Sequence, residues 1–163
     1  MDLNDLQKLL LKIAQEIPEK GLRIIGNEGK LFIQKNFQEE GFTDATTDKW
    51  EERKTEDSKG RDITRYRTNR VGRAGNLNRY GSKNKDRALL TGHGTGGDKL
   101  RNSWKFRTNV SSKEVRFYTA KKYAARHNEG LDGMPRRQMI GKSAYLDGKI
   151  SDKLTKELDK TLR

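Results

Sequence analysis

The chain has 163 residues, enough for one ordinary domain, with 36 Lys and Arg against 23 Asp and Glu and a net charge of +13. No apolar run approaches the roughly 20 residues of a membrane helix, and the first residues lack the pattern of a secretory signal peptide, so neither feature is expected. Zero cysteines exclude disulfides and thiolate chemistry, and two histidines argue against a multi-histidine metal site.

The positive charge is concentrated in the second part of the chain. Residues 1–50 carry a net charge of −2, whereas residues 51–163 carry +15. This asymmetry indicates a polyanionic partner, of which nucleic acid is the commonest. A charged surface that keeps the protein soluble is an equally good interpretation.

The first predicted element is an amphipathic helix over residues 2–17. Its apolar residues recur at spacings of three and four, which places them on one stripe: Leu3, Leu6, Leu10, Ile13 and Ile17. Pro18 should end or kink this helix, because proline lacks the backbone donor that a helix interior needs.

A second helical pattern follows in residues 22–36, and Gly41 is expected to close it. Gly26 and Gly29 lie on or beside the apolar stripe, where a missing side chain lets another element approach closely. The alternative is ordinary weakening of the helix, by about 1 kcal/mol for each glycine relative to alanine.

Residues 51–82 are predicted to form a flexible basic loop or arm. They hold nine Lys and Arg but only three Leu, Ile, Val or Phe residues, too few to offset the entropy of ordering. Arginines alternate with tyrosines here, so the candidate phosphate contacts are Arg65, Arg67, Arg70, Arg73 and Arg79. A solvated arm without a ligand is the alternative.

A β-hairpin is predicted over residues 103–119. Apolar residues alternate with polar ones on both sides of a polar turn at residues 111–113, which gives the ribbon one buried face. A short helix over residues 120–129 should follow and stop at Gly130, and Met139-Ile140 is expected in a further strand.

The last predicted element is an amphipathic C-terminal helix with apolar residues spaced at four, namely Ile150, Leu154, Leu158 and Leu162. Together these elements predict an α+β fold. We expect a small antiparallel sheet with a central hairpin, packed by N-terminal and C-terminal amphipathic helices, in a single domain over residues 1–163.

Two short motifs suggest chemistry, and neither is convincing. Residues 92–97 match G-x-G-x-x-G, but the segment before them is too short and too charged in its flanks to be the buried strand of a dinucleotide site. His127-Asn128-Glu129 has no second histidine or carboxylate cluster near it in sequence. We therefore expect no catalytic residue, no cofactor and no metal, and a protein that is not an enzyme.

From residue 88 onward several motifs follow one another in a fixed order. Ala88-Leu89-Leu90-Thr91-Gly92 is followed by Leu100-Arg101-Asn102-Ser103, the hairpin, and residues 123–130 with the sequence Tyr-Ala-Ala-Arg-His-Asn-Glu-Gly. Met134-Pro135-Arg136-Arg137-Gln138-Met139-Ile140-Gly141 comes last. This order resembles the phage virion morphogenesis family, the tail-completion and head–tail joining proteins of tailed phages and prophages.

The resemblance implies a structural role in virion assembly and no catalysis. It assigns the motif positions to Trp50, Thr91, Gly92, Leu100, Ser103, Tyr123, Ala124, His127, Gly130, Pro135, Arg137 and Gly141. The implied partners are phage head, neck or tail proteins and further copies in a ring. The positive charge of residues 51–163 adds the expectation of non-specific DNA contact, and the lack of a long apolar run that of no membrane. The implied location is the virion, assembled in the bacterial cytoplasm.

Within these motifs, Tyr123 and Ala124 are expected to anchor the short helix on the sheet, and Pro135 to position the following strand. Arg136 and Arg137 are candidates for pairing with acidic groups of a neighbouring subunit. For each single residue, a role in maintaining the fold is the favoured interpretation. A nucleic-acid-binding module, with residues 61–87 and the hairpin contacting phosphates, is the alternative function.

Overall fold

The computed structural model describes residues 3–52, 58–59, 89–90 and 99–162. Most of the predicted basic arm over residues 51–82 lies outside them. The motif residues Thr91 and Gly92 and the five candidate phosphate contacts also lie outside the described residues: Arg65, Arg67, Arg70, Arg73 and Arg79.

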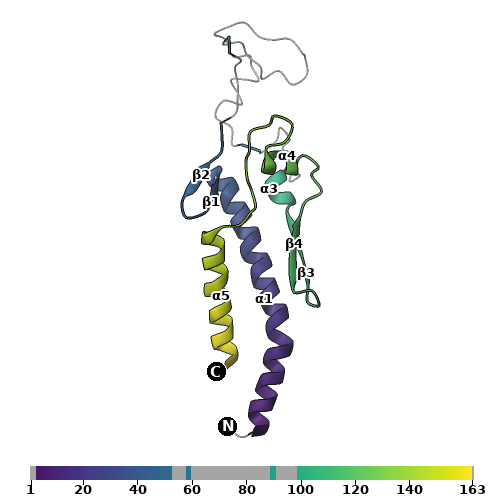
Figure 1. Cartoon of the computed structure of the whole chain (residues 1–163). Helices are drawn as coiled ribbons and strands as arrows, with labels where there is room; N and C mark the ends of the chain where they lie inside the picture. Colours follow the sequence, from purple (N-terminus) through teal and green to yellow (C-terminus); the bar gives the residue numbers. More distant parts are fainter. Residues whose placement is uncertain (1–2, 53–57, 60–88, 91–98, 163) are drawn as a thin grey trace.

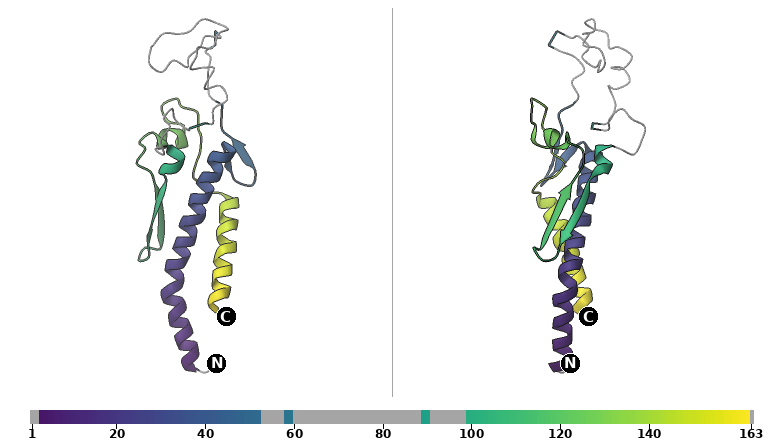
Figure 2. Two further views of the ribbon diagram at one scale, coloured as in Figure 1. Left: turned by 180° about the vertical axis from the view of Figure 1, so that it is seen from behind. Right: turned by 90° about the vertical axis from the view of Figure 1, so that its right-hand side faces the viewer.

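The predicted α+β class is confirmed, with a long helix at the centre of the arrangement. Helix α1 (Leu3–Glu39) is the longest element; α5 (Ala144–Leu162) lies along one side of it and the hairpin of residues 105–118 along the other (Figures 1 and 2). The sheet differs from the expectation. Two separate antiparallel pairs replace a single sheet, namely β1 (Gly41–Thr43) with β2 (Thr47–Lys49) and β3 (Lys105–Asn109) with β4 (Glu114–Tyr118).

Of the two expectations for Pro18, that it ends the first helix was wrong, because α1 is one helix of 37 residues that includes Pro18. Proline removes one backbone hydrogen bond, to the carbonyl of residue 14, at a cost of about 3 kcal/mol in a helix interior. Beyond Pro18 the helix packs against both α5 and the hairpin, and this tertiary packing stabilises the helical conformation.

The turn after α1 also differs from the prediction. Glu40 (φ 49°), not Gly41, adopts the left-handed conformation that ends the helix, and its carbonyl accepts the Trp50 N–H at 2.7 Å. Gly41 instead begins β1, where a Cβ would lie 2.6 Å from the Asp48 carbonyl oxygen. The small residue is needed here for the close approach of two strands.

The predicted hairpin is confirmed, with Phe106 opposite Phe117 and Thr108 opposite Val115. Its inner face packs on α1 at the two glycines that the sequence singled out. A Cβ at Gly26 would overlap the Phe106 ring, and one at Gly29 would overlap the Phe117 ring. The expected close approach of another element at both glycines is therefore confirmed.

The segment after the hairpin forms α4 (Ala124–Glu129), which starts four residues later than expected and ends at Gly130 (φ 72°) as predicted. The predicted strand at Met139-Ile140 was wrong. Side chains bind that backbone in place of a neighbouring strand: Asn128 Oδ1 accepts the N–H groups of Met139 and Ile140 at 2.8 and 3.1 Å.

The predicted C-terminal helix is confirmed as α5, which lies antiparallel to α1. The Phe32 and Tyr145 rings stack at 6.4 Å near its beginning, and Leu154 lies beside Gly21 further along. The buried core lies at the C-terminal end of α1, between α1, α3 (Leu100–Ser103), α4 and the loops: Ile33, Phe37, Trp50, Leu89, Leu100, Trp104, Ala124 and Met139.

Candidate interaction surfaces

The described motif residues gather around the core, and three of them are buried in it. Trp50, Leu100 and Ala124 belong to the core cluster. The Trp50 indole N–H donates to the Gln138 carbonyl at 3.0 Å, and its ring meets Phe37 edge-on at 5.4 Å. These positions hold the fold together and are not accessible to a partner.

Other motif residues fix the connections between elements. The Ser103 hydroxyl donates to the Leu100 carbonyl at 2.8 Å and lies 2.6 Å from the Thr119 hydroxyl, which ties α3 to the end of β4. Gly141 faces the Gln138 side-chain amide so closely that a Cβ would overlap it. Half-buried Pro135 precedes an irregular segment instead of the expected strand.

Arg137 has the favoured role of maintaining the fold instead of the alternative role of pairing with a neighbouring subunit. Its side chain is buried, and the guanidinium donates to the Glu51 carbonyl at 2.9 and 3.1 Å and to the Glu52 carbonyl at 3.3 Å. Charged donors to backbone carbonyls make strong hydrogen bonds. Arg137 therefore stabilises the chain where it leaves β2. Arg136 is exposed and donates a hydrogen bond to the Gln138 side chain at 2.6 Å.

Tyr123 and His127 form an edge-on ring pair on α4 with centroids 6.1 Å apart. Tyr123 is 44% exposed and Ala124 is buried in the core, so Ala124 is the more buried of the two expected anchors. The Nδ1 atom of His127 is buried and has no hydrogen-bond partner among the described residues. Burial, and to a lesser extent the Arg137 charge, lowers the pKa of His127 below 6.5.

This environment predicts a loss of stability in mild acid. The unfolded chain binds a proton at His127 more readily than the folded chain. The free energy of unfolding is therefore undiminished by this group above pH 6.5 and decreases as the pH falls below that value. Urea unfolding of the wild type at a series of pH values from neutral to mildly acidic should show this slope. His127→Gln should flatten it, whereas His93→Gln serves as a control for histidine loss alone; an unchanged slope in His127→Gln would contradict the prediction.

The outer face of the hairpin is strongly basic. Outward positions on β3 and β4 and the turn between them form what we term the basic hairpin face, consisting of Lys105, Arg107, Lys113 and Arg116. Residues 99–123 contain eight Lys and Arg and one Glu. The alternative function proposed from the sequence included phosphate contacts by the hairpin. The strand register now shows which of its basic side chains lie on one face.

An open hollow of about 580 Å³ lies between α1 and β3, beside the basic hairpin face. Arg23 and Arg107 line it together with Asn27, Phe106 and Thr108. Arg23 forms an ion pair with Glu19 at 2.8 Å, one turn earlier in α1. Among the described residues that line the hollow, Arg107 is the charged one without an ion pair.

The end of the α1–α5 pair away from the core is apolar and exposed. None of the residues of α5 is buried, although four apolar residues follow one stripe of it, and Leu158 and Leu162 are 39% and 58% exposed. On α1, Leu11 is 62% exposed. Figures 1 and 2 show α1 extending past the end of α5, so we term the exposed residues of both helices here the helical end.

Metal-ligand geometry is not seen in the described part of the chain, where no three His, Cys, Asp or Glu side chains lie close enough to hold an ion. No described helix is long and apolar enough to span a membrane. Comparison with known proteins gave no match among family models, curated proteins or solved structures.

Proposed function

We propose that this protein is a non-enzymatic structural component of a tailed phage or prophage that acts in tail completion or head–tail joining. The order of its sequence motifs supports the family. The observation that carries a structural role is the helical end, because an amphipathic helix without a single buried residue is typical of a surface that a partner covers.

The proposed occupant of the helical end is a second copy of the chain. Helix α5 carries four lysines and four acidic residues, and α1 carries six basic and five acidic residues. These two helices are therefore almost neutral in a chain with a net charge of +13. Two positively charged copies meet there with the least repulsion.

The function is tested by deleting the gene in frame from the phage or prophage that encodes it. We expect full heads and tails to accumulate without joining, visible by electron microscopy of the lysate, and infectious particles to be lost. The wild-type gene supplied from a plasmid should restore them. Intact virions at normal titre after deletion would overturn the proposal.

The assembly mechanism is tested with Leu158→Asp/Leu162→Asp in the full chain. Both side chains are exposed in the single chain, so the variant should fold. In the interface between two copies the new carboxylates would be buried without a partner, so self-association measured by light scattering should be abolished and the variant should not rescue the deletion. Lys156→Asp, nearly opposite Leu158 on α5, is the matched control and should assemble. A wild-type chain that stays monomeric at high concentration would contradict the mechanism.

A further inference from the structure

The basic hairpin face contains a like-charge contact that the described structure does not compensate. Arg107 and Arg116 stand directly opposite each other on β3 and β4. Like charges in this cross-strand position destabilise a hairpin. Neither guanidinium forms an ion pair with a described carboxylate, and Glu114, the one acidic residue of the hairpin, accepts a hydrogen bond from the Ser112 hydroxyl at 3.0 Å.

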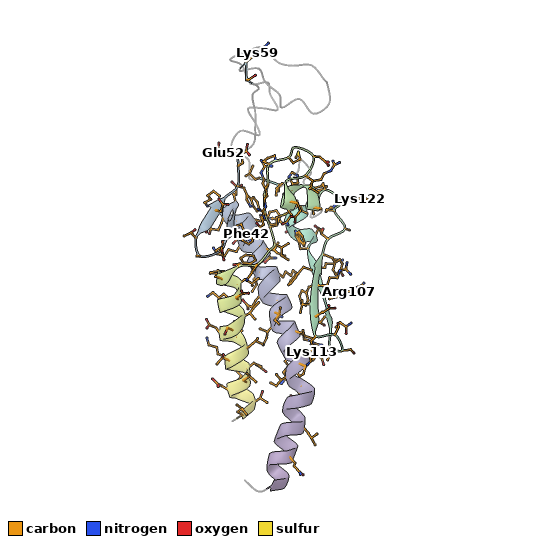
Figure 3. The ribbon with its side chains drawn as sticks, in the orientation of Figure 1. Phe42, Glu52, Lys59, Arg107, Lys113 and Lys122 are labelled. Carbon is orange, nitrogen blue, oxygen red and sulfur yellow. The ribbon has the colours of Figure 1, made fainter. Side chains whose placement is uncertain are left out.

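The arginine at the middle of β3 is also held in place. The Arg107 guanidinium lies over the Tyr118 ring, 5.5 Å from its centroid, in a cation–π contact. Figure 3 shows Arg107 on the side of the hairpin away from α1, with Lys113 at the hairpin tip and Lys122 beyond the other end. The positive charge therefore continues along the whole ribbon.

The outward side chains are unsuited to an ordinary protein interface. Protein interfaces have an apolar core within a polar rim. Of the six outward positions on β3 and β4, five carry exposed charged or amide side chains, namely Lys105, Arg107, Asn109, Glu114 and Arg116, and only the sixth, Tyr118, is aromatic. The face instead matches the polyanionic backbone of a nucleic acid.

The dimensions of the ribbon favour a duplex. The major groove of B-form DNA is about 12 Å wide and admits a two-stranded β-ribbon. Outward residues on one strand are about 6.8 Å apart, since each residue advances about 3.4 Å. Basic side chains from both strands can thus reach phosphates on either side of the groove while the inner face stays packed on α1.

We propose that the basic hairpin face binds duplex nucleic acid through its phosphates, with Arg107 and Arg116 as the central contacts. Phosphate contacts position a protein without selecting a sequence, so binding should be non-specific, with a dissociation constant of about 10⁻⁴ to 10⁻⁶ M at physiological salt. The inference does not depend on the proposed role in virion assembly and is tested separately from it.

The test is titration of a labelled random-sequence duplex with the full chain across a salt series. Each lost phosphate contact should lower the slope of log affinity against log salt by about 1, so Arg107→Gln/Arg116→Gln should lower it by about 2. The matched control is Lys149→Gln/Lys153→Gln, which removes the same charge from α5 on the opposite side of α1 (Figure 1). The control should retain the wild-type slope.

Thermal melting checks the fold. The hairpin variant loses both the repulsion between the two arginines and the Arg107–Tyr118 contact, so its Tm should stay close to that of the wild type. Arg107→Lys/Arg116→Lys should keep most of the slope, because lysine also contacts phosphate. Equal losses in the hairpin and control variants would show that net charge alone matters and would overturn the proposal. A wild-type chain that binds polyglutamate through these arginines but not the duplex would overturn it in favour of an acidic protein.

Discussion

Gly26→Ala should destabilise the protein by about 1–2 kcal/mol, although alanine is the better helix former. In an exposed helix the same change gains up to about 1 kcal/mol. At Gly26 the new methyl group would overlap the Phe106 ring, and forcing an extra carbon into a packed contact costs about 1–3 kcal/mol. The loss should exceed the gain because the Phe106 ring packs against both α1 and the Phe117 ring, whose centroid lies 6.1 Å away.

Chemical denaturation of three further variants isolates this contact. Gly148→Ala on α5, where no atom lies within 4 Å of the added carbon, should stabilise by about 0.5–1 kcal/mol. Phe106→Ala creates space, so adding Gly26→Ala to it should no longer destabilise. If Gly26→Ala alone stabilises the chain as Gly148→Ala does, the Phe106 ring does not pack against Gly26 and the prediction is contradicted.

Local patterns predicted several elements because the information lies in nearby residues. Alternation gave the hairpin and its inner face, spacing at four gave α5, and Gly130 gave the end of α4. The two glycines within a helical stripe also predicted a close approach correctly, although they did not identify the hairpin as the element that approaches.

The errors in prediction share one physical cause. Pro18 is a strong local signal, but contacts with distant elements decided that the helix continues beyond it. Met139 lies in an apolar pair that favours a strand, yet its backbone is bound by side chains far away in sequence. Local propensity is a weak guide wherever contacts across the fold use the same backbone groups.

The candidate surfaces were predicted only in part for the same reason. The charge distribution indicated that the protein has a basic surface for a polyanionic partner, but the strand register was needed to place Arg107 opposite Arg116. The motif residue Arg137 was a candidate for a subunit contact as well as for a role in the fold, and only the structure shows that it is buried on backbone carbonyls. A basic residue in sequence therefore does not reveal whether its partner lies inside or outside the chain.

Asn36→Ala should destabilise the fold by about 2–4 kcal/mol, the largest effect expected from a single polar side chain here. Asn36 is fully buried on α1 and joins two distant segments: its Nδ2 donates to the Met139 carbonyl at 3.1 Å, and its Oδ1 accepts the Thr43 N–H at 3.1 Å. Alanine would leave both backbone groups buried without a partner, and each such group costs about 1–3 kcal/mol.

Asn27→Ala, on the exposed surface of the same helix, is the matched control and should change stability by less than about 0.5 kcal/mol. Hydrogen exchange gives a local readout, since the Thr43 amide should lose protection in Asn36→Ala well before the β3–β4 amides do. An Asn36→Ala chain with wild-type stability and a protected Thr43 amide would contradict the bridging role. Because α1 also packs against the hairpin and α5, both proposed interaction surfaces depend on a helix that this amide joins to the segments at Thr43 and Met139.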